Sequence, residues 1–338
     1  MHVLITGGAG FIGSHLAELH LRQGHQVHVV DDLSTGRLAN VEPFLESPKF
    51  RFQEADVLVW DGLDKTVAWA DRIYHMAALV GMRRVLAEPT RVLAINIAGT
   101  ERLLRAVQNG GWHPQILLAS TSEVYGTQAE AGQDPASFDE GAMLSFSTGV
   151  LSRQNYALSK LVDENLGLAF AKKFGLRVVI ARLFNTIGPR QRGRYGMVVP
   201  NFVRKAVEGD PITVFGDGTQ RRSFIDVRDT VRALDLLAGT ASSSPEIVNV
   251  GRDRDISILD LAKMVKERAG SASPIEFIPY EEAYGEPFED CRFRRPVLER
   301  LRRITGFEAR IPLEQTLDEL IRAERALVHL DSLRSLAS

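Results

Sequence analysis

The chain has 338 residues, of which 44% are hydrophobic and 25% charged, and its formal net charge is −2. This length suits two domains, and the balance is ordinary for a globular protein with a buried core. The small net charge and the lack of a long basic tract argue against a nucleic-acid or anionic membrane partner. No apolar run approaches the roughly 18 residues of a membrane span.

Cys291 is the single cysteine, so no intrachain disulfide can form. Free thiols are usual in reducing compartments. We therefore expect a cytoplasmic protein in which this thiol has no catalytic role.

The first half of the chain alternates short apolar runs with amphipathic helical patterns. We expect strands at 2–5, 27–30, 51–53, 72–75, 115–119 and 177–181, and helices at 12–23, 96–109 and 156–174. Strands joined by helices in this order specify a parallel sheet covered on both faces, the doubly wound or Rossmann α/β fold. The continuous apolar run 178–180 fits a strand that is buried on both faces.

The composition changes after about Pro189, where Gly, Pro and Arg become frequent and the elements shorten. We therefore expect a first domain at 1–185, with a returning segment near 222–252. A second, smaller α/β domain that binds substrate would occupy mainly 186–330.

A glycine-rich turn follows directly on the first strand. Residues 6–13 read Thr-Gly-Gly-Ala-Gly-Phe-Ile-Gly, so that Gly7, Gly10 and Gly13 stand three apart between a strand and a helix. Glycine tolerates backbone torsions that other residues avoid, and it lets the main chain approach a pyrophosphate closely. The helix that follows points free N–H groups and its positive dipole end at the phosphates. The pattern therefore predicts a dinucleotide site.

Asp31 ends the second strand and completes this fingerprint. It stands 18 residues beyond Gly13, near the spacing of an acid that bonds the adenosine ribose hydroxyls. Because a carboxylate repels a 2′-phosphate, we predict NAD rather than NADP, although Arg37 lies nearby. The alternative is an ordinary glycine turn in which Asp31 caps a loop.

Tyr156 and Lys160 form a candidate proton-transfer pair. They are spaced i, i+4 on one expected helix and so share a face. A neighbouring ammonium lowers the pKa of a phenol because it favours the phenolate. The phenolate could then take a hydroxyl proton while hydride leaves the same carbon. The spacing alone is common, and an exposed helical pair would explain it equally well.

Polar residues that follow the strand at 115–119 strengthen the functional interpretation. The carboxyl ends of parallel strands carry the ligand site in such folds. Thr121 or Ser122, just beyond this strand, could supply a hydroxyl that orients the substrate oxygen.

Together these motifs resemble the extended short-chain dehydrogenase/reductase family, in its branch of nucleotide-sugar epimerases, dehydratases and decarboxylases. The resemblance covers about residues 2–325. It rests on TGGAGFIG at 6–13, DDLSTG at 31–36, Asp56-Val57, HMAA at 75–78, NIAGT at 96–100, STSEVYG at 120–126, YALSK at 156–160, RLFNTIGPRQ at 182–191, GDGTQRRSF at 216–224 and YGEPFEDCRFRRP at 284–296.

The resemblance implies an NAD site and a set of catalytic residues. The residues that would bind NAD are Gly7, Gly10, Phe11, Ile12, Gly13, Asp31, Asp32, Ser34, Gly36, Asp56, Val57, Ala77, Ala78, Asn96, Tyr156 and Lys160. Asn96 would help to hold Lys160 through water. The catalytic residues would be Thr121, Ser122, Glu123, Tyr156 and Lys160.

The resemblance also implies a UDP-sugar site. Asn185 would contact the diphosphate, and Val199 and Pro200 would line the base pocket. Arg222 and Arg294 would pair with the pyrophosphate, which planar guanidinium groups bind well.

Two departures from the family pattern affect this assignment. Val297 stands where an R-x-P-D pattern often has aspartate, which bears on the final loop. The segment SRQNY at 152–156 differs from typical decarboxylases, which bears on the substrate.

The family's reactions share a first step, in which Tyr156 takes the proton of the sugar C4 hydroxyl and hydride passes to NAD. A 4,6-dehydratase carries Thr-Asp-Glu, and Ser122 is a poor acid in place of that aspartate. A decarboxylase expels the carboxylate β to the C4 ketone, and a buried Glu123 beside it would raise the energy of both charges. A 4-epimerase needs no acid there, so Glu123 would be unexplained unless it is a structural ion-paired acid.

We therefore predict decarboxylation of UDP-glucuronate to UDP-xylose. A UDP-sugar 4-epimerase acting on UDP-glucuronate or UDP-glucose is the second candidate, ahead of a 4,6-dehydratase. A net dehydrogenase, which would release NADH, and a non-catalytic NAD-binding protein remain as further alternatives, although the intact Thr121, Tyr156 and Lys160 argue against the last. No metal is expected. Family members pair the helices that carry Asn96 and Tyr156, so we also expect a homodimer.

Overall fold

The computed structural model describes residues 1–126, 138–144, 146, 154–193, 197–280, 282 and 291–337. Residues 152–153 of the SRQNY segment and 284–290 of the last motif lie outside the described residues.

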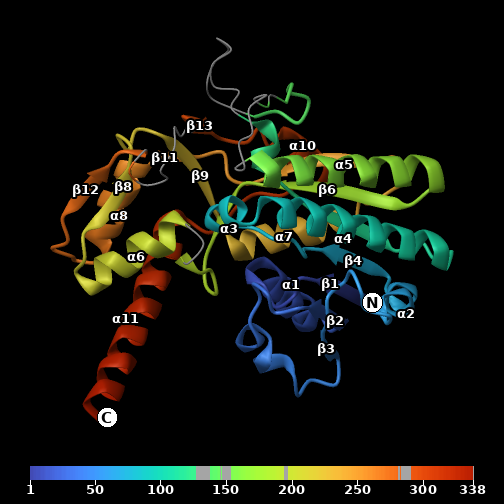
Figure 1. The fold of residues 1–338 in the computed structure, drawn as a ribbon, viewed down its shortest axis with the longest axis horizontal. Coiled ribbons are helices and arrows are strands. Elements are labelled where there is room, and N and C mark those ends of the chain that lie inside the picture. The colour runs from blue at the N-terminus through green and yellow to red at the C-terminus, as the bar shows by residue number, and fades with distance from the viewer. Residues whose placement is uncertain are drawn as a thin grey trace.

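A seven-stranded sheet forms the centre of the molecule, with the strand order β10-β6-β5-β4-β1-β2-β3. Every neighbouring pair in it is parallel. Its strands are β1 (His2–Thr6), β2 (Gln26–Asp31), β3 (Phe50–Glu54), β4 (Arg72–His75), β5 (Gln115–Thr121), β6 (Arg177–Leu183) and β10 (Glu246–Val250). The predicted doubly wound α/β fold is therefore confirmed (Figure 1).

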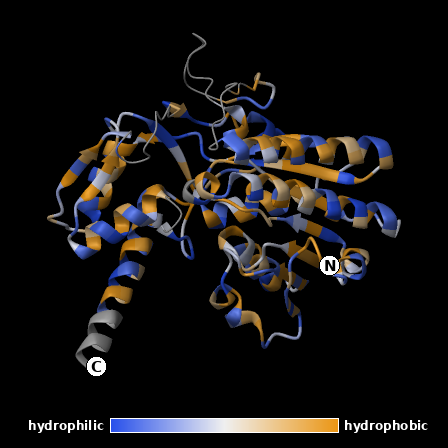
Figure 2. Ribbon diagram, viewed as in Figure 1, coloured by the Kyte–Doolittle hydropathy of each residue, from blue (hydrophilic) through white to orange (hydrophobic). Residues whose placement is uncertain are grey.

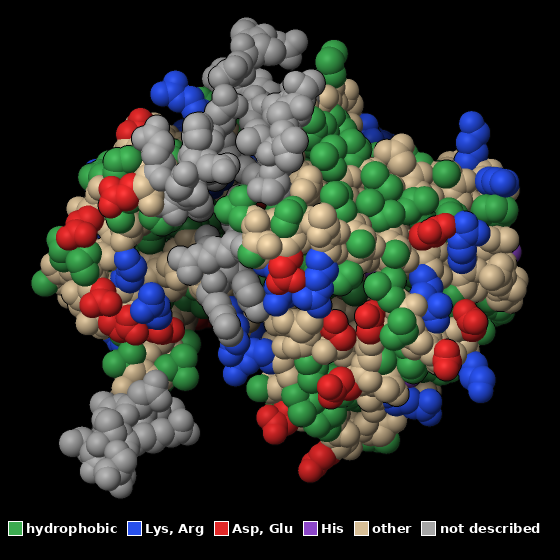
Figure 3. Space-filling view, viewed as in Figure 1, with side chains coloured by type: hydrophobic (Ala, Val, Ile, Leu, Met, Phe, Trp, Pro, Cys, Tyr) green, Lys and Arg blue, Asp and Glu red, His purple; other side chains and the backbone are tan. Residues whose placement is uncertain are grey.

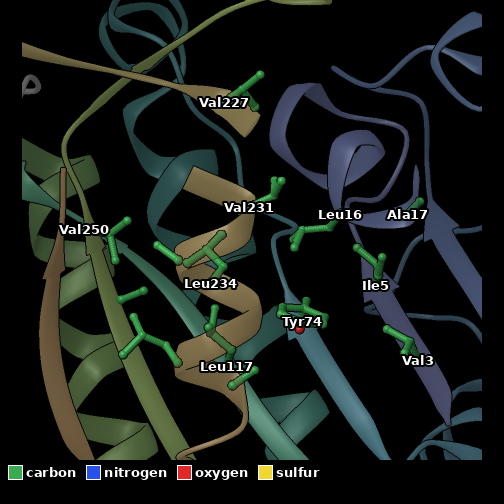
Figure 4. Packing of buried hydrophobic residues seen from close by; sticks show 14 of the residues in the cluster. Val3, Ile5, Leu16, Ala17, Tyr74, Leu117, Val227, Val231, Leu234 and Val250 are labelled. Atoms are coloured by element: carbon green, nitrogen blue, oxygen red, sulfur yellow. The ribbon is translucent and has the colours of Figure 1, made fainter. Parts of the chain in front are cut away.

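Helices cover both faces of this sheet because its strands are apolar on both sides. Val3 and Ile5 face one side, where α1 (Phe11–Arg22) and α7 (Val227–Ala238) pack. Figure 4 shows Val231 and Leu234 of α7 and Leu16 of α1 on this side of the sheet. Leu4 faces the other side. That side is covered by α2 (Leu63–Trp69), α4 (Pro89–Gly110) and α5 (Gln154–Phe174).

Hydrophobic residues follow the strands of the large sheet and the helix faces next to it (Figure 2). This pattern gives two buried clusters, one on each side of the sheet. The sheet is thereby a rigid platform for the residues at its carboxyl edge.

Helix α4 begins about two turns before the start at 96 that the sequence pattern indicated. Pro89 occupies its first turn, where a missing N–H costs nothing and the fixed φ is helical. The helix ends at Gly111, whose φ of 62° is left-handed. The earlier start extends α4 beneath the loop that follows β4.

The later part of the chain builds a smaller α/β unit beside the large sheet. Its strands are β7 (Asn185–Ile187), β9 (Arg221–Asp226), β11 (Asp255–Ser257) and β13 (Phe293–Arg294) in one sheet, with β8 (Ile212–Phe215) and β12 (Ile275–Ile278) in another. A third buried cluster joins them to α6 (Val198–Glu208), α8 (Ile258–Arg268) and α11 (Leu313–Ala337).

The chain returns from the smaller unit to the large sheet after β9. Helix α7 and strand β10 form this returning segment, and α10 (Glu299–Thr305) packs beside them.

Helix α11 runs outward from the smaller unit to the C-terminus (Figure 1). Among the described helices, none is both long and apolar enough to cross a membrane.

Candidate active site

A cavity of about 1230 Å³ lies at the carboxyl edge of the large sheet, between it and the smaller unit. It brings together most of the predicted site residues. The lining residues among them are Gly7, Gly10, Phe11, Ile12, Gly13, Asp31, Asp32, Ser34, Asp56, Val57, Ala77, Ala78, Thr121, Ser122, Glu123, Tyr156, Lys160, Asn185, Val199, Pro200, Arg222 and Arg294. Gly36 and Asn96 are not among the lining residues.

The glycine turn after β1 is built for close approach. Gly7 has a φ of 70°, and a Cβ on it would lie 2.6 Å from the Ala77 nitrogen. A Cβ on Gly13 would lie 2.3 Å from the Gly7 carbonyl oxygen. Gly10 is different, because its closest neighbour would be 3.1 Å away and its open side lines the cavity. The turn and the start of α1 therefore leave a main-chain cradle that fits a dinucleotide pyrophosphate.

Asp31 organises this turn as well as lining the cavity. Its carboxylate accepts hydrogen bonds from the Ala9 and Leu33 N–H groups, both at 2.9 Å. Burial raises the pKa of Asp31 above its ordinary value. Gly36 packs against it, since a Cβ there would lie 2.6 Å from Asp31 Oδ1. The loop-capping and cofactor interpretations of Asp31 are thus compatible, while Gly36 acts through Asp31.

Tyr156 and Lys160 lie on α5 and line the cavity with Thr121, the last residue of β5. The ammonium of Lys160 is buried and donates to Asp163 Oδ2 at 3.0 Å. Burial raises the pKa of Tyr156 above its ordinary value, and the charges of Glu123 and Asp163 raise it further. A hydrogen bond with Thr121 acts in the opposite direction.

This result corrects the expectation that Lys160 alone would lower the phenol pKa. The main physical reason is that burial disfavours the phenolate, and the carboxylates of Glu123 and Asp163, of which sequence reasoning missed Asp163, raise the pKa further. The i, i+3 spacing of Lys160 and Asp163 is the signal that could have revealed it.

Asn96 lies behind the cavity wall rather than in it. Its side chain accepts from the Leu79 N–H at 2.8 Å and donates to the Leu79 carbonyl at 3.3 Å. It also donates to Ser159 Oγ at 3.0 Å. In these contacts Asn96 ties the loop after β4 to α5 immediately before Lys160.

His75, at the end of β4, is a buried neutral group beside the proton-transfer pair. Its ring lies 2.7 Å from Thr6 Oγ1 through Nδ1 and 3.2 Å from Thr100 Oγ1 through Nε2. Burial and the charge of Lys160 lower the pKa of His75 to about 3. It therefore adds no positive charge to the site near neutral pH.

Glu123 and Arg294 lie next to each other in the wall of the cavity. Glu123 lies on the short helix η3 (Ser122–Tyr125), where Thr121 Oγ1 accepts from its N–H at 3.2 Å. Arg294 Nη1 of β13 is 3.5 Å from Glu123 Oε1. The guanidinium of Arg294, which we expect to pair with the pyrophosphate, thus lies beside a carboxylate near Tyr156.

A buried ion pair between α5 and β6 also bonds the end of β5, the strand that leads into η3. Glu164 of α5 receives two hydrogen bonds from Arg182 of β6, at 2.9 and 2.8 Å. Ser120 donates to the same carboxylate at 2.5 Å. The sequence motifs contained Ser120 and Arg182 but not Glu164, and nothing in them indicated this contact.

The far end of the cavity is formed by the smaller unit. Val199 and Pro200 line it from α6, and Arg222 lines it from β9. Asn185 of β7 donates to the Ser223 carbonyl at 3.2 Å, which joins two strands at the cavity wall. Further lining residues that the motifs did not single out are Thr213, Phe215, Gln220, Ile278 and Tyr280.

Two other features lie away from this chemistry. Cys291 is buried and donates to the Phe293 carbonyl at 2.9 Å, as a structural thiol would. In the part of the chain that the structure describes, no group of three or more His, Cys, Asp or Glu side chains is arranged to hold a metal ion.

Comparison with known proteins agrees with this geometry. The sequence profile of the NAD dependent epimerase/dehydratase family matches residues 3–251. The chain belongs to this family. It is an NAD-dependent enzyme, and its cradle of Gly7, Gly10 and Gly13 suits that cofactor.

Relatives within the family include hexuronate decarboxylases. The chain is 34% identical over 319 residues to the UDP-N-acetyl-alpha-D-glucosaminuronate decarboxylase of Bacillus cytotoxicus, covering 94% of this chain and 96% of that protein. It is 35% identical over 319 residues to UDP-glucuronic acid decarboxylase 1 of Danio rerio, covering 94% of this chain and 71% of that protein.

A solved structure shows the same fold. MoeE5 in complex with UDP-glucuronic acid and NAD superposes with a TM-score of 0.81 at 28% identity. The superposition covers 97% of this chain and all of that one. The prediction of the nucleotide-sugar branch of the family is therefore confirmed.

Proposed function

We propose that this enzyme decarboxylates a UDP-hexuronate, with UDP-glucuronate as the substrate and UDP-xylose as the product. The observation that carries the proposal is the Glu123–Arg294 pair, 3.5 Å apart and lining the same cavity as Tyr156 and Lys160. The same cavity is lined by the residues that the sequence motifs assign to NAD and UDP-sugar binding. The pair would therefore lie beside a bound sugar.

The pair suits a substrate that carries its own carboxylate. Arg294 is 10% exposed in its side chain, so its guanidinium is a partly desolvated partner for an anion. Glu123 sits beside it and repels an incoming carboxylate, which raises the energy of the bound hexuronate. When carbon dioxide leaves, the bonding electron pair moves into the C4–C5 enolate, so the negative charge moves away from Glu123. Protonation at C5 then removes this charge, so the arrangement favours decarboxylation.

The chain's own residues prepare the first step. Thr121 and Tyr156 are placed to hold the sugar C4 hydroxyl, and Tyr156 would take its proton. The glycine cradle and Asp31 would hold NAD, which would supply the acceptor for the C4 hydride and the donor that returns it to C4 at the end, so that NAD is regenerated. Arg294 of β13 and Glu123 of η3 would face the carboxylate side of the sugar.

Two observations support other members of the branch. The Bacillus relative acts on a hexuronate with an N-acetyl group, so UDP-N-acetylglucosaminuronate is an alternative substrate. A UDP-sugar 4-epimerase is the second candidate reaction, because the fold and the Thr121, Tyr156 and Lys160 set serve both reactions. In an epimerase Glu123 would be only the structural partner of Arg294.

One assay separates these outcomes. The purified protein is incubated with NAD and, separately, UDP-glucuronate, UDP-N-acetylglucosaminuronate and UDP-glucose, and products are analysed by mass spectrometry and proton NMR. We expect UDP-glucuronate to lose the mass of carbon dioxide. An unchanged mass with an inverted C4 signal would make the enzyme an epimerase, and no turnover of any of the three would reject both reactions.

We further propose that the protein is a homodimer in the cytoplasm. Helices α4 and α5 lie side by side, and hydrophobic side chains occur on the face they form (Figure 3). Val162 is 40% exposed there, and Ala94, Ala98 and Ala169 are also exposed. Pairing this face with a second copy would bury those side chains. The single free cysteine suits a reducing compartment.

A further inference from the structure

Asp163 is a buried carboxylate next to the reacting groups that the proposed chemistry does not use. It lies on α5 one turn beyond Lys160, and its Oδ2 accepts from Lys160 Nζ at 3.0 Å. The two side chains are only 3% and 4% exposed. Asp163 does not line the cavity, whereas Lys160 does. Any effect of Asp163 on the reaction must therefore pass through Lys160 or through its charge.

Among the described residues, Lys160 is the cation that pairs with Asp163, because the other charged groups nearby are paired elsewhere or neutral. Glu164, the adjacent carboxylate, is neutralised by Arg182 at 2.8 Å. His75 faces the pair from β4 but is neutral near pH 7, since its pKa is lowered to about 3. Helix α4 contributes the uncharged Thr100 on this side, where it contacts His75 at 3.2 Å.

The groups that face Tyr156 are equally few in the described structure. Glu123 faces it from η3 with Arg294 of β13 behind, and Lys160 and Asp163 face it from α5 itself. The negative charge of Asp163 opposes formation of a phenolate, whereas the ammonium of Lys160 favours it. The two charges lie side by side, so they act on the phenol together.

We propose that Asp163 is a positioning residue, which holds the Lys160 ammonium at the cavity floor and offsets part of its charge, so that the pair rather than Lys160 alone sets the reactivity of Tyr156. This inference rests on the proposed function only for its kinetic test. Its stability test needs neither substrate nor turnover.

The kinetic test is the pH dependence of kcat/KM with UDP-glucuronate for the unaltered enzyme, D163N, D163E and E164Q. The acid limb of this profile reports deprotonation of the base in the free enzyme. D163N removes a negative charge and leaves the ammonium, so we expect the limb to move down by about one pH unit. D163E keeps the charge and should keep the limb, even if its rate is lower.

E164Q is the matched control. It removes the neighbouring buried carboxylate, whose charge Arg182 balances, so it should lower Tm without moving the limb. A D163N enzyme that loses rate equally at every pH, with the limb unmoved, would show that Asp163 is merely structural and would overturn the proposal.

The second test measures thermal unfolding of the substrate-free protein for K160M, D163N and the double variant. Each single change leaves one buried charge without its partner, so each should lower Tm by about 5 °C or more. The double variant should lose clearly less than the two losses combined. A double variant that folds when D163N does not would be the extreme form of this coupling.

Simple additivity of the two losses would overturn the proposal. This outcome is independent of the reaction, because no substrate is present. An enzyme that ignores UDP-glucuronate but shows the coupling would reject the proposed substrate and retain the Lys160–Asp163 pair.

Discussion

Single residues around Tyr156 carry the proposed chemistry. Thr121, Tyr156 and Lys160, the proposed proton-transfer set, line one cavity, and the carboxylates of Glu123 and Asp163 raise the pKa of Tyr156. In this environment the pKa of Tyr156 lies above its ordinary value, so the protein by itself keeps the phenol protonated. The reactivity of Tyr156 as a base therefore depends on its carboxylate neighbours as well as on Lys160.

Tyr156→Phe should abolish most of the turnover while leaving NAD bound. Removing the hydroxyl deletes the group that takes the C4 proton, and such a loss costs about 10²–10⁴-fold in rate. Turnover of UDP-glucuronate and NAD affinity by calorimetry provide the measurements. A variant as fast as the unaltered enzyme would exclude Tyr156 as the base.

Arg294→Gln should weaken the reaction of hexuronates specifically. The change removes the guanidinium that faces Glu123 at 3.5 Å and would meet the substrate carboxylate. We expect kcat/KM for UDP-glucuronate to fall about 100-fold. NAD affinity, measured in parallel, should remain within about twofold because Arg294 lies on β13, away from the glycine turn. An equal loss of NAD affinity would contradict the assignment.

At the scale of elements, the turn between β1 and α1 shows how packing distinguishes similar glycines. Gly7 needs a left-handed backbone and lies against Ala77, whereas Gly10 faces the cavity with more room. The sequence pattern treats these glycines alike. Only their neighbours show that Gly7 is required by the fold as well as lining the cavity, whereas Gly10 has room toward the cavity.

Gly7→Ala and Gly10→Ala should therefore fail in different ways. A Cβ on Gly7 would lie 2.6 Å from the Ala77 nitrogen at a φ of 70°, so this variant should lose stability as well as NAD binding. A Cβ on Gly10 meets only the Gly7 oxygen at 3.1 Å, so Gly10→Ala should fold but bind NAD about tenfold or more weakly. Tm and NAD affinity by calorimetry test both. Equal Tm losses would contradict this division.

For the whole molecule, buried neutral histidines set the response to acid. His75 is the clearest case, because its pKa is lowered to about 3 and it lies between β4 and α4. The unfolded chain binds a proton at His75 below about pH 6.5, whereas the folded chain does not. Its contribution to stability is therefore complete above pH 6.5 and is lost as the pH falls from there towards 3.

His75→Gln should flatten the fall of stability between pH 6.5 and 5. The charge on an unfolded His75 should cost about 2 kcal/mol at pH 5 in the unaltered protein. Glutamine does not titrate and can still bond Thr6 and Thr100. Urea unfolding at several pH values measures the slope, and two parallel curves would contradict the role of His75.

The proposed dimer gives a second prediction for the whole molecule. Val162→Arg places a charge on the exposed face of α5 and should convert a dimer into a monomer in sedimentation or light-scattering experiments. Leu236→Arg is the matched control, because Leu236 is 42% exposed on α7, which covers the opposite side of the large sheet from α4 and α5. A Val162→Arg protein with unchanged mass in solution would exclude this face as the interface.

The sequence by itself determined the parallel α/β fold, the dinucleotide turn and the Tyr156–Lys160 pair. These features follow from periodicity and spacing between residues that are close in the sequence. It also placed the principal strands to within a few residues, but it began α4 too late because Pro89 was not recognised as a helix start.

Only the tertiary structure decided which groups share the catalytic corner. Asp163 accepts a hydrogen bond from Lys160, and Arg294, which lies near the end of the chain, contacts Glu123. Asn96 bonds Ser159 behind the cavity wall instead of lining the cavity. Charges interact according to their distance and burial, and the packing of β5, α5 and β13 sets both. The pKa of Tyr156 is raised rather than lowered for this reason.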